Sequence, residues 1–419
     1  MKRLLTLLIL TFILVLTACQ TPQNSSVESA CKASIDDFQN TPATDVFETA
    51  GLKRTSATLT GYFDTLLSLT LYTDASVNTN EILTCVEKIY QHVHQLATNY
   101  DAFEGIMNVY QMNQNPGMRY DIDPLLADII RLGLEYGELT DGLFDISLGP
   151  LINIWSDAMT TCNEGGVCDI PSEEQLLEAS NLIGNQRIRL DGITFQALEG
   201  TQIDLGGVAK GYAAALVGDY LRFRGDVKGF LINAGTSNIE VYGLHPTRDN
   251  ERWLIALRHP EWPDRVLRFA DFSSFPSLFD DQKPMKRVLY FAENSNKTYI
   301  WTGVDYKEIN ESYARLFLDS GEHIVTAGDY QRFFEVGGVM FHHILDPRTL
   351  FPGQTMRSIT LVGPDGVLGD VLSTAAFLME PLDAITFVES HGFEAILYTL
   401  DGRILYSESI RLRMDEIHE

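Results

Sequence analysis

The pattern of apolar and polar positions predicts strands and amphipathic helices that follow one another without a regular alternation. Residues 59–71 are expected to form a strand with one buried face, because three leucines, the last at Leu71, alternate with polar residues. A helix is expected to begin at Asn78 or Asn80, and its apolar stripe consists of Ile82, Val86, Ile89, Val93 and Leu96. This irregular order favours an α+β fold with a mainly antiparallel sheet core and flanking helices.

The rest of the chain continues the same pattern. Asp123 followed by Pro124 predicts the start of a helix that extends to about Leu139. The last strong helix is expected at 369–379, and a closing hairpin at 394–406 turns at Asp401-Gly402. Residues 261–322 are irregular and rich in aromatic residues, so we expect an insertion there.

One stretch between a strand and a helix favours a bound ligand. Gly206 and Gly207 lie just before the predicted helix, and Lys210 lies in its first turn. Glycines let the backbone approach a ligand, and the first turn of a helix offers free N–H groups to an anion. The stretch therefore fits a phosphorylated ligand, although a helix start with two packing glycines remains an alternative. It is neither a Walker A loop nor a G-x-G-x-x-G motif.

The N-terminus has the features of an export signal. Lys2 and Arg3 precede an apolar run that ends in Leu16-Thr-Ala, and Cys19 follows directly. This arrangement resembles the lipobox of bacterial lipoproteins, so residues 1–18 are expected to be a signal peptide and Cys19 to carry the lipid. The polar residues 19–55 are expected to be a flexible tether, which leaves 56–419 as the folded domain. The protein would then be exported, on the outer face of the cytoplasmic membrane or in the periplasm.

Net charge and cysteines narrow the possible partners. The 419-residue chain has a formal charge of −26 without a basic cluster, which argues against nucleic acid and against binding an anionic bilayer by charge. Cys162 and Cys168 flank a short glycine-rich segment, and a disulfide or free thiols are favoured over a zinc pair because no His lies nearby. A pairing of Cys31 with Cys85 is also open.

Two groups near the C-terminus carry candidate chemistry. Asp370 and Thr374 are four residues apart on one helix face, where a carboxylate and a hydroxyl can form part of a Mg²⁺ shell. The alternative is that the Asp complements the helix dipole and the Thr bonds back to the chain. His343 precedes Asp346-Pro347 and is a candidate general base, with a buried structural histidine as the alternative.

Taken in order, the motifs resemble the ApbE family of FAD:protein FMN transferases. The matching segments, within about 59–407, are Phe63-Asp64-Thr65, Met112-Asn113, 141–145 with Gly149-Pro150-Leu151 and Trp155, 204–212, Asn233-Ala-Gly235, 343–349 and 370–375. The chain departs from the family pattern in three places: Thr236 and Leu350 stand where many members have glycine, and the segment 261–322 is long.

The resemblance implies a fold with two lobes that enclose FAD as a substrate. The residues that it places on FAD are Phe63, Asn113, Leu143, Phe144, Asp145, Asp204, Lys210 and Leu345. It also implies a Mg²⁺ ion, whose ligands would be the Asp370 carboxylate, the Thr374 hydroxyl and the carbonyls of Gly207 and Ser373.

The same resemblance implies a reaction. A Thr hydroxyl of an exported acceptor, such as a subunit of a redox complex, would attack the FMN phosphorus and release AMP, with His343 near the attacking hydroxyl. Two alternatives remain at this point. Water as the nucleophile would give an FAD pyrophosphatase, and loss of chemistry would leave a lipoprotein that only binds FAD.

Overall fold

The computed structural model describes residues 45–49, 51–235, 237–248, 251–261, 289–291, 298–301, 306–308 and 310–417. The predicted signal peptide, the predicted lipidation site Cys19, most of the predicted tether and much of 261–322 lie outside these residues. Within the described ranges, no helix combines the length and the apolar character that a bilayer crossing requires.

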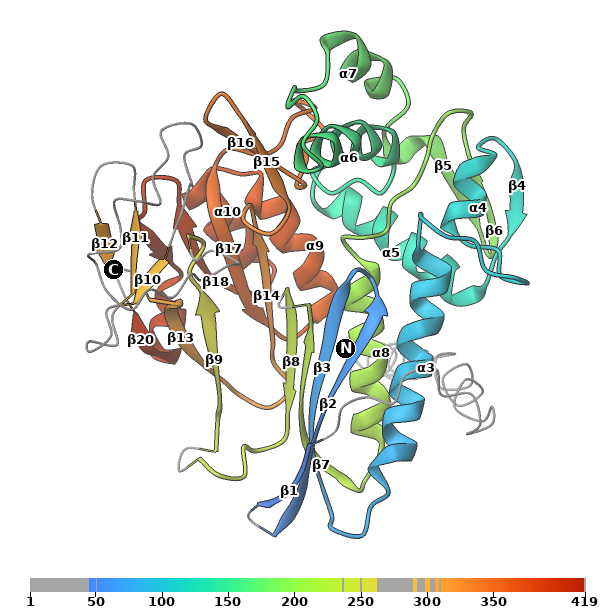
Figure 1. Ribbon diagram of the computed structural model, residues 1–419. Helices are drawn as coiled ribbons and strands as arrows, with labels where there is room; N and C mark the ends of the chain where they lie inside the picture. The colour runs from blue at the N-terminus through green and yellow to red at the C-terminus, as the bar shows by residue number, and fades with distance from the viewer. Residues whose placement is uncertain are drawn as a thin grey trace, which may run out of the picture.

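The core is one nine-stranded sheet in which all neighbouring strands are antiparallel (Figure 1). Its strands, in spatial order, are β1 (Asp45–Thr49), β2 (Leu52–Tyr62), β3 (Thr65–Thr73), β7 (Val227–Ala234), β8 (Asn238–Tyr242), β14 (His323–Gly328), β17 (Met356–Gly363), β18 (Glu394–Thr399) and β19 (Ile404–Tyr406). The predicted α+β class with a mainly antiparallel core is confirmed.

Helices cover one face of this sheet. They are α3 (Thr79–Ala97), α8 (Ala209–Phe223), α9 (Gly366–Phe377) and α10 (Pro381–Ser390). The sequence signals for α3 hold, since Asn78 caps the helix and the predicted apolar stripe is buried. Helix α8 packs between α3 and α9, so the start of α8 is flanked by both helices.

A small sheet covers the opposite face. It consists of β20 (Met414–Ile417), β13 (Ser312–Leu318) and β9 (Trp253–Arg258), with a 3₁₀ helix η3 (Glu408–Arg413) before β20. Tyr313 and Leu316 of β13 are fully buried in the cluster between the two sheets. The prediction that all of 261–322 is an insertion is therefore wrong at its C-terminal end, because β13 belongs to the core.

Three short strands, β10 (Leu289–Phe291), β11 (Thr298–Trp301) and β12 (Tyr306–Glu308), form an antiparallel sheet within the same segment. They are the other described strands of the predicted insertion.

A second lobe lies beyond one end of the central sheet (Figure 1). Its elements are α4 (Val109–Gln114), β4 (Arg119–Asp121), α5 (Pro124–Leu139), α6 (Gly149–Asn163), α7 (Glu173–Ser180), η1 (Asn185–Arg187), β5 (Ile188–Asp191) and β6 (Thr194–Ala197). The hairpin of β15 (Phe333–Val336) and β16 (Val339–His342) joins it, because Phe334 and Phe341 pack on Trp155 of α6.

Two boundaries differ from the sequence prediction. The end of the predicted tether forms β1 and the start of β2, since residues 53–56 pair with 70–73 of β3 although their composition is polar. The predicted strand 59–71 is a hairpin that turns at Phe63 and Asp64, so these two residues lie at its tip.

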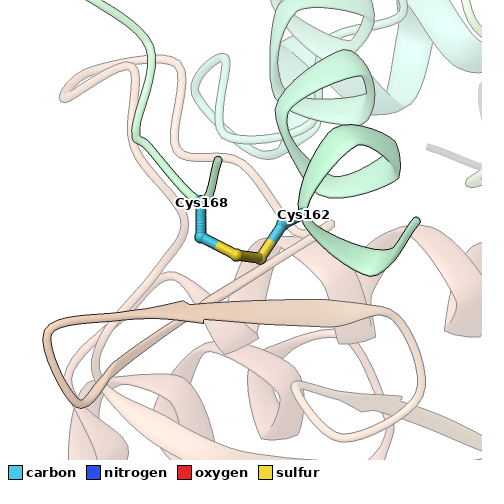
Figure 2. The surroundings of a disulfide bond; sticks show 2 residues. All are labelled: Cys162 and Cys168. Atoms are coloured by element: carbon cyan, nitrogen blue, oxygen red, sulfur yellow. A yellow bond between two sulfur atoms is a disulfide. The ribbon is translucent and has the colours of Figure 1, made fainter. Parts of the chain in front are cut away.

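The short-range disulfide, one of the alternatives that the sequence left open, is present. Cys162, near the end of α6, is bonded to Cys168 in the connection to α7 (Figure 2). Cys85 also forms a disulfide, whereas Cys31, its candidate partner from the sequence, lies outside the described residues.

Candidate functional site

The start of α8 is the centre of the site. Asp204 shapes the loop before the helix: its Oδ1 accepts a hydrogen bond from the Gly206 N–H (2.8 Å) and its Oδ2 one from Asn99 Nδ2 (2.8 Å). Lys210, the second residue of α8, donates from Nζ to the Gly206 carbonyl (2.9 Å). The glycine pair thus precedes a helix start that has a lysine beside it, as the sequence predicted.

The charges around this helix start perturb one another. Loss of hydration raises the pKa of Asp204, while Gly206 N–H, Lys210 and Arg332 oppose that rise. Loss of hydration also lowers the pKa of Lys210; Asp370 and Asp204 counteract this, and Arg332 adds to it. Two acids and two cations therefore act at one place, which is an arrangement suited to a charged ligand.

Helix α9 places Asp370 directly against α8. A Cβ built on Gly211 would lie 2.5 Å from Asp370 Oδ2 and 3.1 Å from Asn238 Nδ2, so only glycine leaves room for this carboxylate. Asp370 is buried, and its Oδ2 forms no hydrogen bond within the described part of the chain. Burial raises the pKa of Asp370 to about 6, against the opposing effects of Lys210, Asn238 and the Gly211 N–H.

The chemistry of this donor set fits a hard cation. The Thr374 hydroxyl donates to the Asp370 carbonyl (3.0 Å), which leaves its oxygen lone pairs free to ligate. A buried carboxylate oxygen without a partner is the group that a bound cation would satisfy. The described residues contain no group of three His, Cys, Asp or Glu that could hold a metal, so the other ligands must be hydroxyl, carbonyl or substrate oxygens, as Mg²⁺ prefers.

The two predicted carbonyl ligands differ in their surroundings. Gly207 lies in the turn before α8, four residues before Gly211, and the Phe144 ring packs on it. Ser373 lies inside α9, where its hydroxyl donates to the Asp370 carbonyl (2.9 Å) and its own carbonyl points along the helix. Both carbonyl ligands remain predictions.

The 141–145 motif packs on the same helix start. A Cβ on Gly207 would lie 2.7 Å from Phe144 Cε2, so the ring rests on the glycine backbone. The Phe144 N–H donates to Thr140 Oγ1 (3.1 Å), and the Ser147 N–H donates to Asp145 Oδ1 (2.7 Å). Leu143 is buried, and burial raises the pKa of Asp145. Three motifs far apart in the sequence therefore meet at α8.

His343 and His342 have opposite surroundings. Both ring nitrogens of the buried His342 are used, on the Gly353 carbonyl (2.6 Å) and the Ile344 N–H (3.2 Å). The His343 side chain is exposed. Loss of hydration, followed by the charges of Arg332, His342 and Lys210, nevertheless lowers its pKa below the usual range. Its imidazole is thus neutral at neutral pH and available as a proton acceptor.

The β2–β3 turn brings Phe63 to the helices. Phe63 and Asp64 both have positive φ angles, 53° and 52°, a strained conformation for these residue types. The Phe63 N–H donates to His94 Nδ1 (3.2 Å), and the Phe63 ring packs edge-on against His94 and Tyr90. His94, on α3, therefore supports this turn.

Two predicted FAD residues have mainly structural contacts here. Both polar atoms of the Asn113 amide bind the backbone of Ile203, at 2.8 and 2.9 Å, and so fix the segment that leads to Asp204. Leu345 is buried and forms an isolated bridge with Pro352. Their contacts with FAD remain predictions.

Sequence reasoning missed four residues of this site. Arg332 follows β14 and influences Asp204, Lys210 and His343, whereas Asn99 binds Asp204 and Asn238 lies beside Asp370. Tyr90 is fully buried, and burial followed by the charge of Asp370 raises its pKa. The one available signal was the position of Arg332, eleven residues before His343.

Comparison with known proteins gives one family. The sequence model described as the ApbE family matches residues 63–276 and 293–397. A FAD:protein FMN transferase of Rhodobacter capsulatus is 25% identical over 330 residues, 78% of this chain and 52% of that protein. This chain therefore spans about half the length of that relative. A Klebsiella pneumoniae FAD:protein FMN transferase is 27% identical over 282 residues, 66% of this chain and 70% of that one.

Solved structures agree on the fold. The ApbE protein of Thermotoga maritima has a TM-score of 0.65 at 23% identity, covering 86% of this chain and 100% of that one. The flavin transferase ApbE from Vibrio cholerae has a TM-score of 0.61 at 18% identity, covering 86% of this chain and 99% of that one.

Proposed function

The chain belongs to the ApbE family, and from this premise we propose that it transfers FMN from FAD to a Thr hydroxyl of an acceptor protein, with Mg²⁺. The products are a phosphoester on the acceptor and AMP. Relatives named FAD:protein FMN transferase support the reaction class.

One observation carries this proposal for the chain itself. The buried Asp370 carboxylate, whose Oδ2 has no hydrogen bond within the described residues, lies against the start of α8, where Lys210 and the charge of Arg332 also act. Asp370 would take up a cation, and the lysine, the arginine and the free N–H groups of the helix would face phosphate oxygens.

Different residues would act on the attacking hydroxyl and on the phosphoryl group with its leaving AMP. His343 would accept the proton of the attacking hydroxyl as the new P–O bond forms and the bond to AMP breaks. Lys210 and Arg332 would stabilise the negative charge on the phosphoryl oxygens and on the leaving AMP. Phe144, packed on Gly207, would hold FAD beside the helix start.

The cation completes this site. Mg²⁺ held by Asp370, Thr374 and the carbonyls of Gly207 and Ser373 would neutralise phosphate charge and orient the phosphoryl group for in-line attack.

The cellular setting is part of the same proposal. Signal-peptide cleavage before Cys19 and a lipid on its sulfur would tether the enzyme outside the cytoplasmic membrane. An exported redox subunit with a target Thr would then be its acceptor.

The test is a reconstituted transfer with the chain from Gln20 onward, which keeps both β1 and β2. The protein is mixed with FAD, Mg²⁺ and a Thr-containing acceptor domain, and acceptor mass and AMP are followed together. We expect one FMN per acceptor with an equal amount of AMP, and loss of both when a chelator is added. Asp370→Asn should abolish transfer, while Asp383→Asn, on the exposed start of α10, serves as the matched control.

A pyrophosphatase activity is the second candidate, because the exposure of His343 lets water reach the same position as an acceptor hydroxyl. Free FMN and AMP without a mass change in the acceptor would support it. FAD binding without either product would leave the non-catalytic alternative.

A further inference from the structure

We infer that Asn238 is a positioning residue for the metal-binding carboxylate of Asp370, which it reaches from the first position of β8. The inference rests on the proposed function, because it assigns a role to Asn238 in the cation site proposed there.

The position of Asn238 is fixed by one hydrogen bond. Its side chain is 1% exposed, and Nδ2 donates to the carbonyl of Gly366 (2.9 Å), the first residue of α9. Gly366 lies four residues before Asp370, so this bond ties β8 to the turn of α9 that presents the carboxylate. The acceptor is a carbonyl, which settles the amide orientation with nitrogen on this side.

The same amide nitrogen faces Asp370. A Cβ built on Gly211 would lie 3.1 Å from Asn238 Nδ2 and 2.5 Å from Asp370 Oδ2, so both atoms surround the same position beside α8. An amide nitrogen carries two hydrogens, and Gly366 uses one, so the other is available to the carboxylate. The presence of Asn238 also opposes the rise of the Asp370 pKa, as expected for a donor that favours the charged form.

If Asn238 only tied β8 to α9, an asparagine would not be required at this position. A single hydrogen bond to the Gly366 carbonyl requires one donor, which a threonine can supply in a strand. The amide adds a second donor on the same atom, which lies near the carboxylate, and we assign that donor to Asp370. Groups that orient a metal ligand in this way commonly change metal affinity 10–100-fold when they are removed.

The experiment measures Mg²⁺ binding directly and transfer separately. Isothermal titration with Mg²⁺ in the presence of FAD is run on the wild type, Asn238→Ala and Asn238→Thr, and the Mg²⁺ dependence of AMP release is measured in parallel. Asn238→Thr keeps one donor and suits a strand, so it covers the case in which Asn238→Ala does not fold. Thr360→Val is the matched control, since it removes a buried hydrogen bond to Thr326 in the same sheet.

We expect both Asn238 variants to bind Mg²⁺ about 10–100-fold more weakly, with most of kcat recovered at saturating Mg²⁺. Thr360→Val should leave Mg²⁺ affinity unchanged. The inference is overturned if a folded Asn238→Thr protein binds Mg²⁺ as tightly as the wild type, or if Thr360→Val weakens binding equally. Absence of Mg²⁺ binding in the wild type would instead refute the proposed function.

Discussion

Gly211→Ala separates the stability of the fold from the geometry of its site. Gly211 lies inside α8, where alanine is favoured over glycine by about 0.8–1 kcal/mol. The added Cβ would lie 2.5 Å from Asp370 Oδ2, whereas ordinary contact begins at 3.4 Å. The carboxylate or its helix must therefore move by about 0.9 Å, the difference between these distances. Both Asp370 and the amide of Asn238 would be pushed away from α8.

The expected result is a folded protein with little activity. The gain in helix propensity offsets part of the cost of the displacement, so the unfolding midpoint in urea should change little. A shift of about 1 Å in a group that positions the reacting atoms can cost about 100-fold in rate. AMP release and acceptor flavinylation should fall by about this factor, and the Mg²⁺ requirement should rise.

A matched substitution tests this reasoning. Gly225 follows α8, and a Cβ at this position meets nothing within 4 Å, so Gly225→Ala should retain wild-type activity. If Gly211→Ala transfers FMN at a rate within threefold of the wild type, the close approach of Asp370 to α8 is not part of the mechanism.

Three further predictions address the cation, pH and the disulfide. Asp370→Asn should lose the rise in melting temperature that Mg²⁺ gives the wild type, which differential scanning fluorimetry measures directly. The pKa of Asp370 in the native protein, about 6, lies above its reference value of 3.8. In the presence of a chelator, the native protein therefore keeps this proton up to a higher pH than the unfolded protein does. Its stability should therefore fall by roughly 3 kcal/mol as pH rises from about 4 to about 6; urea titrations that show a rise would refute this. Replacing both Cys162 and Cys168 with serine should cost at most about 2 kcal/mol of stability, because the loop is short, and should leave the rate of transfer unchanged.

Local patterns were sufficient for the regular elements. The caps and apolar stripes of α3 and α5 lie within single segments, and both helices form where the sequence predicts them. The beginning of β2 was missed because its residues are polar and gain their strand character from pairing with β3. In the same way, β13 is a core strand only because a second sheet packs on the first.

The same distinction applies to the residues of the site: local motifs could be predicted, whereas isolated residues could not. Motifs with several residues in a row, such as 141–145 and 204–212, were found and do meet in space. Asn99, Asn238 and Arg332 are single polar residues without periodicity, and each acquires a role only from the tertiary contact of its segment. The sequence also could not show that both polar atoms of the Asn113 amide form hydrogen bonds with the backbone of Ile203.

Leu350 shows how the chain accommodates one departure from its family. The position has a φ of 65°, the left-handed region in which glycine is unstrained and other residues lose about 1–2 kcal/mol. The leucine side chain packs against the cluster that contains Trp155, and its carbonyl accepts the indole N–H of Trp155 (2.9 Å). Burying a leucine side chain contributes about 1.5–3 kcal/mol when complete, so partial burial is enough to offset the backbone strain. The loop that carries His343 and Asp346 thus keeps the turn that glycine would allow, while the leucine fastens it to α6 of the second lobe.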